Sequence, residues 1–361
     1  MRQTLFRIRL DDLWSLEPIG NISAAGVGYV ILLPSLVLGL WWGMYIVRKT
    51  GLKAEHWLPI GIWFAIAAVA LMIPQWSRNW KSTSIPVYGY GFMLLVGFLL
   101  AGWMASRRAQ HEGLAAEVIW DLATWLFFSG IVGARLFYLI QFRKRVFADK
   151  QRLDEYVLTA VNLPDGGLVL YGGVLFGIVA YLIFCHRQKI SPLLMADVAI
   201  PSFFIALACG RFGCFLNGCC YGDPCELPWA ITFPQGSVPF IGLVNRGFSD
   251  PDAVTSMPLH PTQLYSSINA MVLGFLTASY FKHRNYDGAV ITLALISYPI
   301  TRFVIEILRS DGIGQWGTGL TISQLVSLAV LVFGIGLGYW CWLKQPLRNS
   351  SVTTGLAQSP V

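Results

Sequence analysis

The chain contains the stretch Gly210-Arg211-Phe212-Gly213-Cys214-Phe215-Leu216-Asn217-Gly218-Cys219-Cys220-Tyr221-Gly222, directly after an apolar run from Ala199 to Cys209. The apolar run indicates a membrane helix, so Arg211 stands at or near membrane depth. An arginine there costs roughly 2.5–3.5 kcal/mol on insertion scales and needs a partner or a wet cavity. The flanking glycines let the backbone leave helical geometry and approach a ligand. The plainer alternative is that Arg211 lies at a helix end and its long side chain extends to the membrane surface (snorkelling).

The composition of the whole chain agrees with this first impression. The 361 residues are 55% hydrophobic and only 12% charged, whereas soluble domains carry about 25% charged residues. We therefore predict an all-α polytopic membrane protein, in which the fourteen Trp and fourteen Tyr suit an interfacial aromatic belt. The net charge of +7 favours contact with anionic membrane lipids. It does not indicate nucleic acid, because the cations are spread over short loops.

Nine apolar segments are each about long enough to cross roughly 30 Å of hydrocarbon, so we predict nine spans. They are residues 25–47, 57–74, 85–105, 118–141, 168–186, 193–210, 264–281, 288–308 and 320–343. The bias of Lys and Arg toward cytoplasmic loops normally sets the orientation. Here the loops on each side hold eleven such residues, so the charge count leaves the orientation open.

Polar regions suggest how the chain is divided. Residues 221–260 are the longest non-apolar stretch and hold six prolines, which predicts a small external head or functional loop. We therefore expect an N-terminal extension at 1–84 with two spans and a membrane core at 85–343 that includes this head. Residues 344–361 read as a disordered tail.

Charged residues inside the spans are the main candidates for chemistry. Four arginines lie within spans or at their ends: Arg135, Arg211, Arg302 and Arg309. Tyr298, Arg302, Glu306 and Arg309 share one helical face, and Asp197 is a further acid that could balance the arginines. Glu306 can neutralise one arginine, which leaves a surplus for an anionic ligand. An internal ion-pair network that fixes helix packing is the structural alternative.

Three further motifs combine aromatic or imidazole groups with glycine or proline. They are Tyr88-Gly89-Tyr90-Gly91, Tyr171-Gly172-Gly173 and His260-Pro261-Thr262-Gln263-Leu264-Tyr265. Each has a plain structural interpretation: an interfacial belt, close helix packing and a helix entry with proline in its first turn. Each could also direct a polar group at a ligand.

Four of the seven cysteines form a C-x4-C-C-x4-C cluster from Cys214 to Cys225. The cluster has no C-x-x-C pair of the zinc type. In an oxidising compartment, one or two disulfides could rigidify this loop, and we prefer that interpretation. Free thiols or a metal site remain the alternatives.

Together these motifs resemble those of the bacterial prolipoprotein diacylglyceryl transferases, over roughly residues 85–343. The residues that carry the resemblance are Tyr90-Gly91, Gly133-Ala134-Arg135, Tyr171-Gly172-Gly173, Gly210 to Gly213 with Asn217-Gly218, His260 to Tyr265, and Tyr298 with Arg302, Glu306 and Arg309. The resemblance implies a seven-span core in the bacterial inner membrane, with the C-terminus cytoplasmic and the active site open toward the outer leaflet. The first two spans lie outside the match.

The resemblance also implies a reaction, its partners and its site. The diacylglyceryl group of phosphatidylglycerol would move to the lipobox cysteine of a prolipoprotein signal peptide, with no metal or organic cofactor. The expected catalytic residues are Arg211, Arg302, Tyr171 and Arg135. The expected substrate-binding residues are Tyr90, Asn217, Gly210, Gly213, Gly172, His260, Tyr298, Glu306 and Arg309.

The sequence departs from the family pattern at three positions. Familiar members have histidine at Tyr171, asparagine at Cys214 and an acidic residue at Cys219. A tyrosine with a pKa of about 10 is a poor base at neutral pH, so we expect Tyr171 to donate a hydrogen bond. Two other functions stay open: a small-anion transporter or channel lined by the arginines, and a membrane thiol oxidoreductase.

Overall fold

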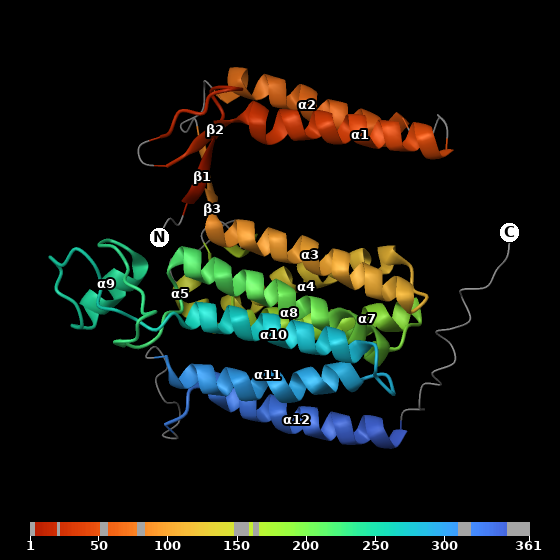
Figure 1. The fold of residues 1–361 in the computed structure, drawn as a ribbon, viewed down its shortest axis with the longest axis vertical. Helices are drawn as coiled ribbons and strands as arrows, with labels where there is room; N and C mark the ends of the chain where they lie inside the picture. Colours follow the sequence, from red (N-terminus) through yellow and green to blue (C-terminus); the bar gives the residue numbers. More distant parts are fainter. Residues whose placement is uncertain are drawn as a thin grey trace. The chain divides into compact units, whose positions relative to one another are not determined.

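The computed structural model describes residues 4–19, 22–50, 57–77, 84–147, 159–161, 166–309 and 319–344, and it is mostly helical (Figure 1). The chain divides into two compact units. The first unit is Met1–Leu95 with Phe212–Leu259, and the second is Val96–Arg211 with His260–Val361. The tail predicted beyond Lys344 lies outside the described residues.

A three-stranded sheet opens the first unit, in the order β2-β1-β3. Strand β1 (Thr4–Arg9) runs parallel to β2 (Ala24–Gly26) and antiparallel to β3 (Ser84–Tyr88). The prediction of an all-α chain does not include this sheet. Strands of three to six residues are too short for their alternation to stand out in the sequence.

Two helices follow the second strand. After the π-helical turn η1 (Gly28–Leu32) come α1 (Leu33–Thr50) and α2 (Trp57–Ser77), which pack together around Leu32, Ala67 and Ala70. They correspond to the first two predicted spans. Their described apolar parts are shorter than the other spans, at Gly28–Leu40 and Phe64–Ser77.

The proline-rich stretch after residue 220 folds around a small core of its own. Its helix α9 (Val238–Asn245) is capped by Ser237, whose side chain accepts a hydrogen bond from the Phe240 backbone amide at 3.4 Å. The side chains of Phe233, Leu243 and Leu259 are buried together. This stretch is therefore a folded head rather than an extended loop.

Among the residues that the structure describes, seven helices are long and apolar enough to cross a membrane, which confirms the predicted seven-span core. They are α3 (Gly89–His111), α4 (Ala116–Gln141), α7 (Leu170–Gln188), α8 (Pro192–Asn217), α10 (Thr262–Phe281), α11 (Ala289–Ile307) and α12 (Ile322–Lys344). A four-residue helix, α5 (Arg143–Val146), follows α4.

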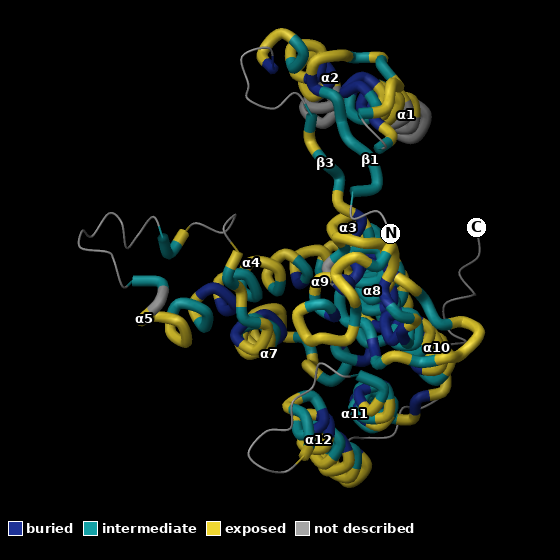
Figure 2. Tube along the Cα trace, turned by 90° about the vertical axis from the view of Figure 1, so that its left-hand side faces the viewer, coloured by how far each residue is buried: buried dark blue, intermediate teal, exposed yellow. Residues whose placement is uncertain are grey.

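Buried apolar side chains from six of these helices form the core of the second unit. They include Ala109, Ile119, Phe184, Met195, Phe281 and Val290. Large apolar side chains also remain on the outside of the helices, where Figure 2 shows exposed residues along the tubes. Such surfaces suit contact with lipid tails, because large exposed apolar patches mark interaction surfaces.

A buried ion network ties α8 to the start of α11. The Asp197 carboxylate is fully buried and accepts hydrogen bonds from the backbone amides of Gly288 at 2.8 Å and Ile291 at 2.9 Å. Its Oδ2 lies 3.4 Å from Nε of Arg284, whose Nη2 lies 3.0 Å from Glu112. Fourteen residues of helix separate Gly288 from Arg302, or about 21 Å. The expectation that Asp197 balances the membrane arginines is therefore wrong.

Candidate active site

The carboxylate of Glu306 holds two arginines at the end of α11. Arg302 Nη2 lies 2.5 Å from Glu306 Oε2, and Arg309 Nη1 lies 3.9 Å from the same oxygen. The three side chains are 6–12% exposed. This matches the helical spacing of three and four residues, which places such groups on one face.

The start of α12 supports the same carboxylate. Thr321 and Gln324 form a capping box. The backbone amide of Gln324 donates to Thr321 Oγ1 at 3.2 Å, and the backbone amide of Thr321 donates to Gln324 Oε1 at 3.0 Å. The Thr321 hydroxyl donates to Glu306 at 3.3 Å, and Arg302 Nη2 donates to Ser323 at 3.3 Å. Thr321 and Ser323 are not among the site residues predicted from the sequence, although Thr-x-x-Gln before an apolar run is a recognisable helix start.

Arg211 completes a cluster of positive charge with these residues. Its charge acts on Arg302, as does the charge of Arg309. We call Arg211, Arg302, Arg309 and Glu306 the arginine cluster. Among these described residues three positive charges stand against one carboxylate, so the cluster carries a surplus of two. Nη1 of Arg302 is buried and has no hydrogen-bond partner among the described residues, so a donor is available to an anion.

The backbone around Arg211 differs from the sequence expectation. Helix α8 continues to Asn217, so Gly210, Arg211 and Gly213 lie within a helix rather than in a turn. No hydrogen bond or ion pair joins the Arg211 side chain to another described residue. Within the described part of the chain, its guanidinium donors are therefore available to a ligand or to water.

Unlike Arg211, Arg135 uses its guanidinium for hydrogen bonds within the protein. Its buried guanidinium donates to the backbone carbonyls of Thr159 at 2.6 Å, Ala160 at 3.0 Å, Gly166 at 2.5 Å and Gly167 at 3.0 Å. These bonds attach the segments after α5 to the face of α4. The geometry favours an anchoring role for Arg135, and direct contact with substrate stays a prediction.

Gly172 lies at the closest crossing of α4 and α7. A Cβ at Gly172 would meet the Gly133 carbonyl oxygen at 2.4 Å, and one at Gly133 would meet the Gly172 oxygen at 2.5 Å. Small residues allow membrane helices to approach this closely. The double glycine is therefore explained by packing, and a substrate-binding role for Gly172 stays a prediction.

We expect Gly172→Ala to destabilise the protein by about 1–3 kcal/mol, because overpacking forces the two backbones apart. Gly177→Ala is the matched control on the same helix, since a Cβ there meets nothing within 4 Å. The measurement is thermal unfolding of both purified variants in detergent. Equal melting temperatures for the two variants would contradict the close crossing.

The other expected site residues of the second unit lie in varied surroundings. Tyr171 is 52% exposed at the start of α7. His260 Nδ1 lies 3.3 Å from the Tyr265 hydroxyl, beside the start of α10. The Tyr298 ring packs on Phe204 at a centroid distance of 5.9 Å. The structure therefore gives Tyr298 a packing contact and leaves Tyr171 accessible.

Three expected binding residues lie in the first unit. Tyr90 is 40% exposed near the start of α3, and a Cβ on Gly213 would meet its ring at 3.2 Å. Gly213 thus allows the start of α3 to contact the end of α8. Asn217 is the last residue of α8 and is partly buried.

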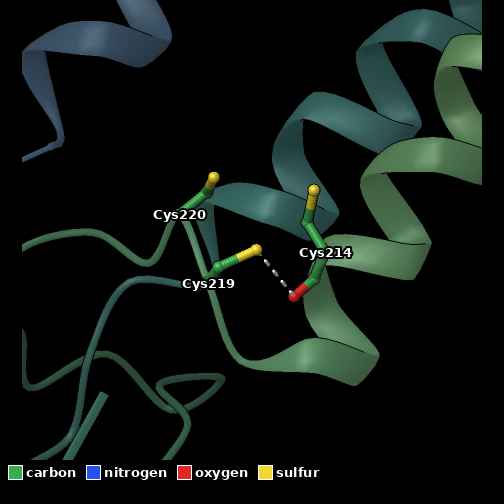
Figure 3. Close-up of side chains that lie close together, drawn as sticks. All are labelled: Cys214, Cys219 and Cys220. Carbon is green, nitrogen blue, oxygen red and sulfur yellow. Dashed lines mark hydrogen bonds between the residues drawn. The ribbon is translucent and has the colours of Figure 1, made fainter. Parts of the chain in front are cut away.

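Three thiols gather around the end of α8, one before Asn217 and two after it. The sulfurs of Cys214, Cys219 and Cys220 all lie within 4.8 Å of one another (Figure 3). None of the seven cysteines forms a disulfide, so the preferred expectation of disulfides is not met in the structure. The pKa of Cys219 is raised: a hydrogen bond with Cys214 lowers it, but one with Cys220 and burial outweigh that effect.

Comparisons with known proteins agree on one family. The model of the family described as prolipoprotein diacylglyceryl transferase matches residues 79–340, close to the expected 85–343. A phosphatidylglycerol–prolipoprotein diacylglyceryl transferase of Clostridium tetani is 32% identical over 70% of this chain and 92% of its own length. The enzymes of that name from Gloeobacter violaceus and Acaryochloris marina are 33% and 34% identical, over 71% and 74% of this chain and 88% and 91% of their own.

Proposed function

The chain belongs to the prolipoprotein diacylglyceryl transferase family, and from this premise we propose that it carries out the first step of lipoprotein maturation. The diacylglyceryl group of phosphatidylglycerol moves to the lipobox cysteine of a prolipoprotein. A carbon–sulfur bond forms at the glycerol carbon, and the carbon–oxygen bond to phosphate breaks. Glycerol phosphate leaves with the bonding electrons, and the thiol proton is released.

The surplus charge of the arginine cluster is the observation that supports this reaction best. Negative charge grows on the phosphate oxygens as the carbon–oxygen bond breaks, and fixed cations in a site of low dielectric stabilise it. Arginine suits phosphate because its planar fork donates two parallel hydrogen bonds. Glu306 orients Arg302 through the 2.5 Å contact, and Arg211 keeps its own donors for the phosphate.

The same positive field assists the nucleophile. A free thiol has a pKa of about 8.5, and nearby cations lower it, so the substrate thiol loses its proton more readily beside the cluster. In this proposal Tyr90, Asn217 and His260 bind the lipid headgroup. Arg135 supports the site indirectly through the loop it anchors.

We further propose that the protein lies in the bacterial plasma membrane with its C-terminus in the cytoplasm and its site open to the outer leaflet. The support is the family likeness, since the charges of the loops do not decide the orientation. A reporter enzyme that is active only in the cytoplasm, fused after Val361, should be active. An inactive fusion beside an intact control at a known cytoplasmic terminus would contradict this orientation.

A transporter or channel for a small anion would use the same surplus charge. Purified protein, phosphatidylglycerol and a synthetic lipobox peptide separate the two functions. Mass spectrometry should detect a peptide that carries one diacylglyceryl group, together with released glycerol phosphate. A peptide with serine in place of the lipobox cysteine is the control. Folded protein that forms no adduct but moves anions into vesicles would favour the transporter.

Tyr171→Phe tests whether this position is a base or a hydrogen-bond donor. The Tyr171 hydroxyl makes no hydrogen bond to another described residue and is exposed, so it is free to bind a headgroup. We expect the variant to slow transfer by about tenfold, the value of roughly one hydrogen bond, and Tyr171→His to remain active.

The measurement is the transfer rate across pH 6 to 9, with Tyr339→Phe as the control on an exposed face of α12. A loss of about a thousandfold for Tyr171→Phe would instead indicate general acid–base catalysis at this position.

A further inference from the structure

The end of α8 brings two cysteines together through a common helix ending. The Gly218 amide bonds to the Phe215 carbonyl at 3.2 Å, and the Cys219 amide bonds to the Cys214 carbonyl at 3.1 Å. Gly218 has φ of +79°. This is the Schellman pattern, in which the residue after the glycine packs on the residue five positions earlier. The left-handed conformation of Gly218 therefore brings Cys219 into contact with Cys214.

The backbone conformation of Cys220 turns its thiol toward those of Cys214 and Cys219. Cys220 has φ of +62°, one of only two positive values among non-glycine residues in the described part of the chain. The Cys219 thiol points at the Cys214 carbonyl at 3.8 Å, as Figure 3 shows. All three cysteines are partly buried, so a small ion can reach them from solvent.

We propose that Cys214, Cys219 and Cys220 form a binding site for one thiophilic metal ion such as Zn²⁺. Three thiolates around a tetrahedral zinc ion, with Zn–S distances of about 2.3 Å, lie about 3.8 Å apart. The observed separations of at most 4.8 Å reach this value with small side-chain rotations. A disulfide needs sulfurs about 2.05 Å apart, and any pairing leaves the third thiol unused.

A residue next to the three cysteines is also a candidate for substrate binding. Asn217 is the last residue of α8 and directly precedes the turn at Gly218, and it is a candidate for binding the lipid headgroup. An ion held by the three sulfurs fixes this turn and the position of Asn217. The fourth ligand position stays open to water. Metal binding itself does not depend on the proposed function, so the two ideas are tested separately.

The first test uses the full chain, purified in detergent and kept reduced. After incubation with Zn²⁺ and gel filtration, elemental analysis should find one zinc per chain. Co²⁺ should give the charge-transfer absorption of cobalt bound to several thiolates. We expect Cys214→Ser, Cys219→Ser and Cys220→Ser each to weaken binding by about ten- to a hundredfold or more, since even changes beyond the direct ligands have effects of that size.

Two cysteines outside the trio provide matched controls. Cys225 lies in the same head and Cys209 lies on α8, and serine at either position should leave zinc binding unchanged. Folded, reduced protein that retains no zinc would overturn the proposal. Loss of binding in Cys225→Ser as large as in Cys219→Ser would overturn it as well.

A second measurement avoids variants that fail to fold. The unaltered protein is treated with iodoacetamide with and without Zn²⁺ and then digested with trypsin. Phe212 to Arg246 has no internal lysine or arginine, so four cysteines remain in one peptide for sequencing by mass spectrometry. Zinc should protect Cys214, Cys219 and Cys220 but not Cys225. Equal labelling with and without zinc, or a disulfide between two of the three that persists under reduction, would contradict a metal site.

Discussion

Arg211→Lys should lower the rate of diacylglyceryl transfer by about a hundredfold or more and leave the protein folded. Arg302 is held by Glu306 and Ser323, and Arg135 is held by backbone carbonyls. Arg211 has no hydrogen bond to another described residue, and in the proposed mechanism its donors bind the phosphate. Lysine keeps the charge but loses the two parallel hydrogen bonds, and removing one transition-state donor typically costs about 10²–10³ in rate.

The measurement is the single-turnover rate with phosphatidylglycerol and a lipobox peptide, beside a melting curve for each variant. Arg107→Lys is the matched control, because Arg107 lies over the Trp103 ring on an exposed part of α3. This control should transfer at close to the normal rate. An Arg211→Lys variant with nearly normal turnover would rule out a bidentate grip at this position.

Asp197→Ala should destabilise the protein by about 3–5 kcal/mol, the usual cost of breaking a buried ion pair. The variant leaves the buried Arg284 with less negative charge beside it, where its side chain is 3% exposed. It also removes the acceptor for two amides at the start of α11, and unpaired buried donors are costly. The measurement is unfolding in mixed micelles with increasing denaturing detergent.

A double variant separates the two causes. Arg284→Met keeps a flexible side chain above the Phe281 ring, which lies 3.9 Å from the guanidinium carbon. Adding it to Asp197→Ala should restore part of the lost stability, because the buried arginine that has lost Asp197 is then gone, and only part, because Glu112 loses its partner. Asp121→Asn on the exposed face of α4 is the control and should change little. A single Asp197→Ala variant as stable as the natural protein would contradict the network.

The sequence alone was sufficient for the spans and for one part of the site. A membrane span can be recognised from its own stretch of sequence. In hydrocarbon, a segment of about 20 apolar residues must form its backbone hydrogen bonds within itself, as a helix does. The Arg302–Glu306 pair is also determined by nearby sequence, because one turn of helix separates the two residues. Helix ends were less certain: α8 extends seven residues beyond the predicted 210, because glycines at 210 and 213 do not interrupt a helix that packs on α3.

Only the tertiary structure decided which distant groups meet. Arg135 bonds to carbonyls 24 to 32 residues away, and Asp197 bonds to amides more than 90 residues away. Nothing in the spacing of these residues predicts such partners, because a buried charge takes whichever partner the folded chain places beside it. The three thiols depend partly on nearby sequence and partly on the tertiary structure. Their glycine and cysteine spacing is local, but the turn at Cys220 that gathers the sulfurs is visible only in three dimensions.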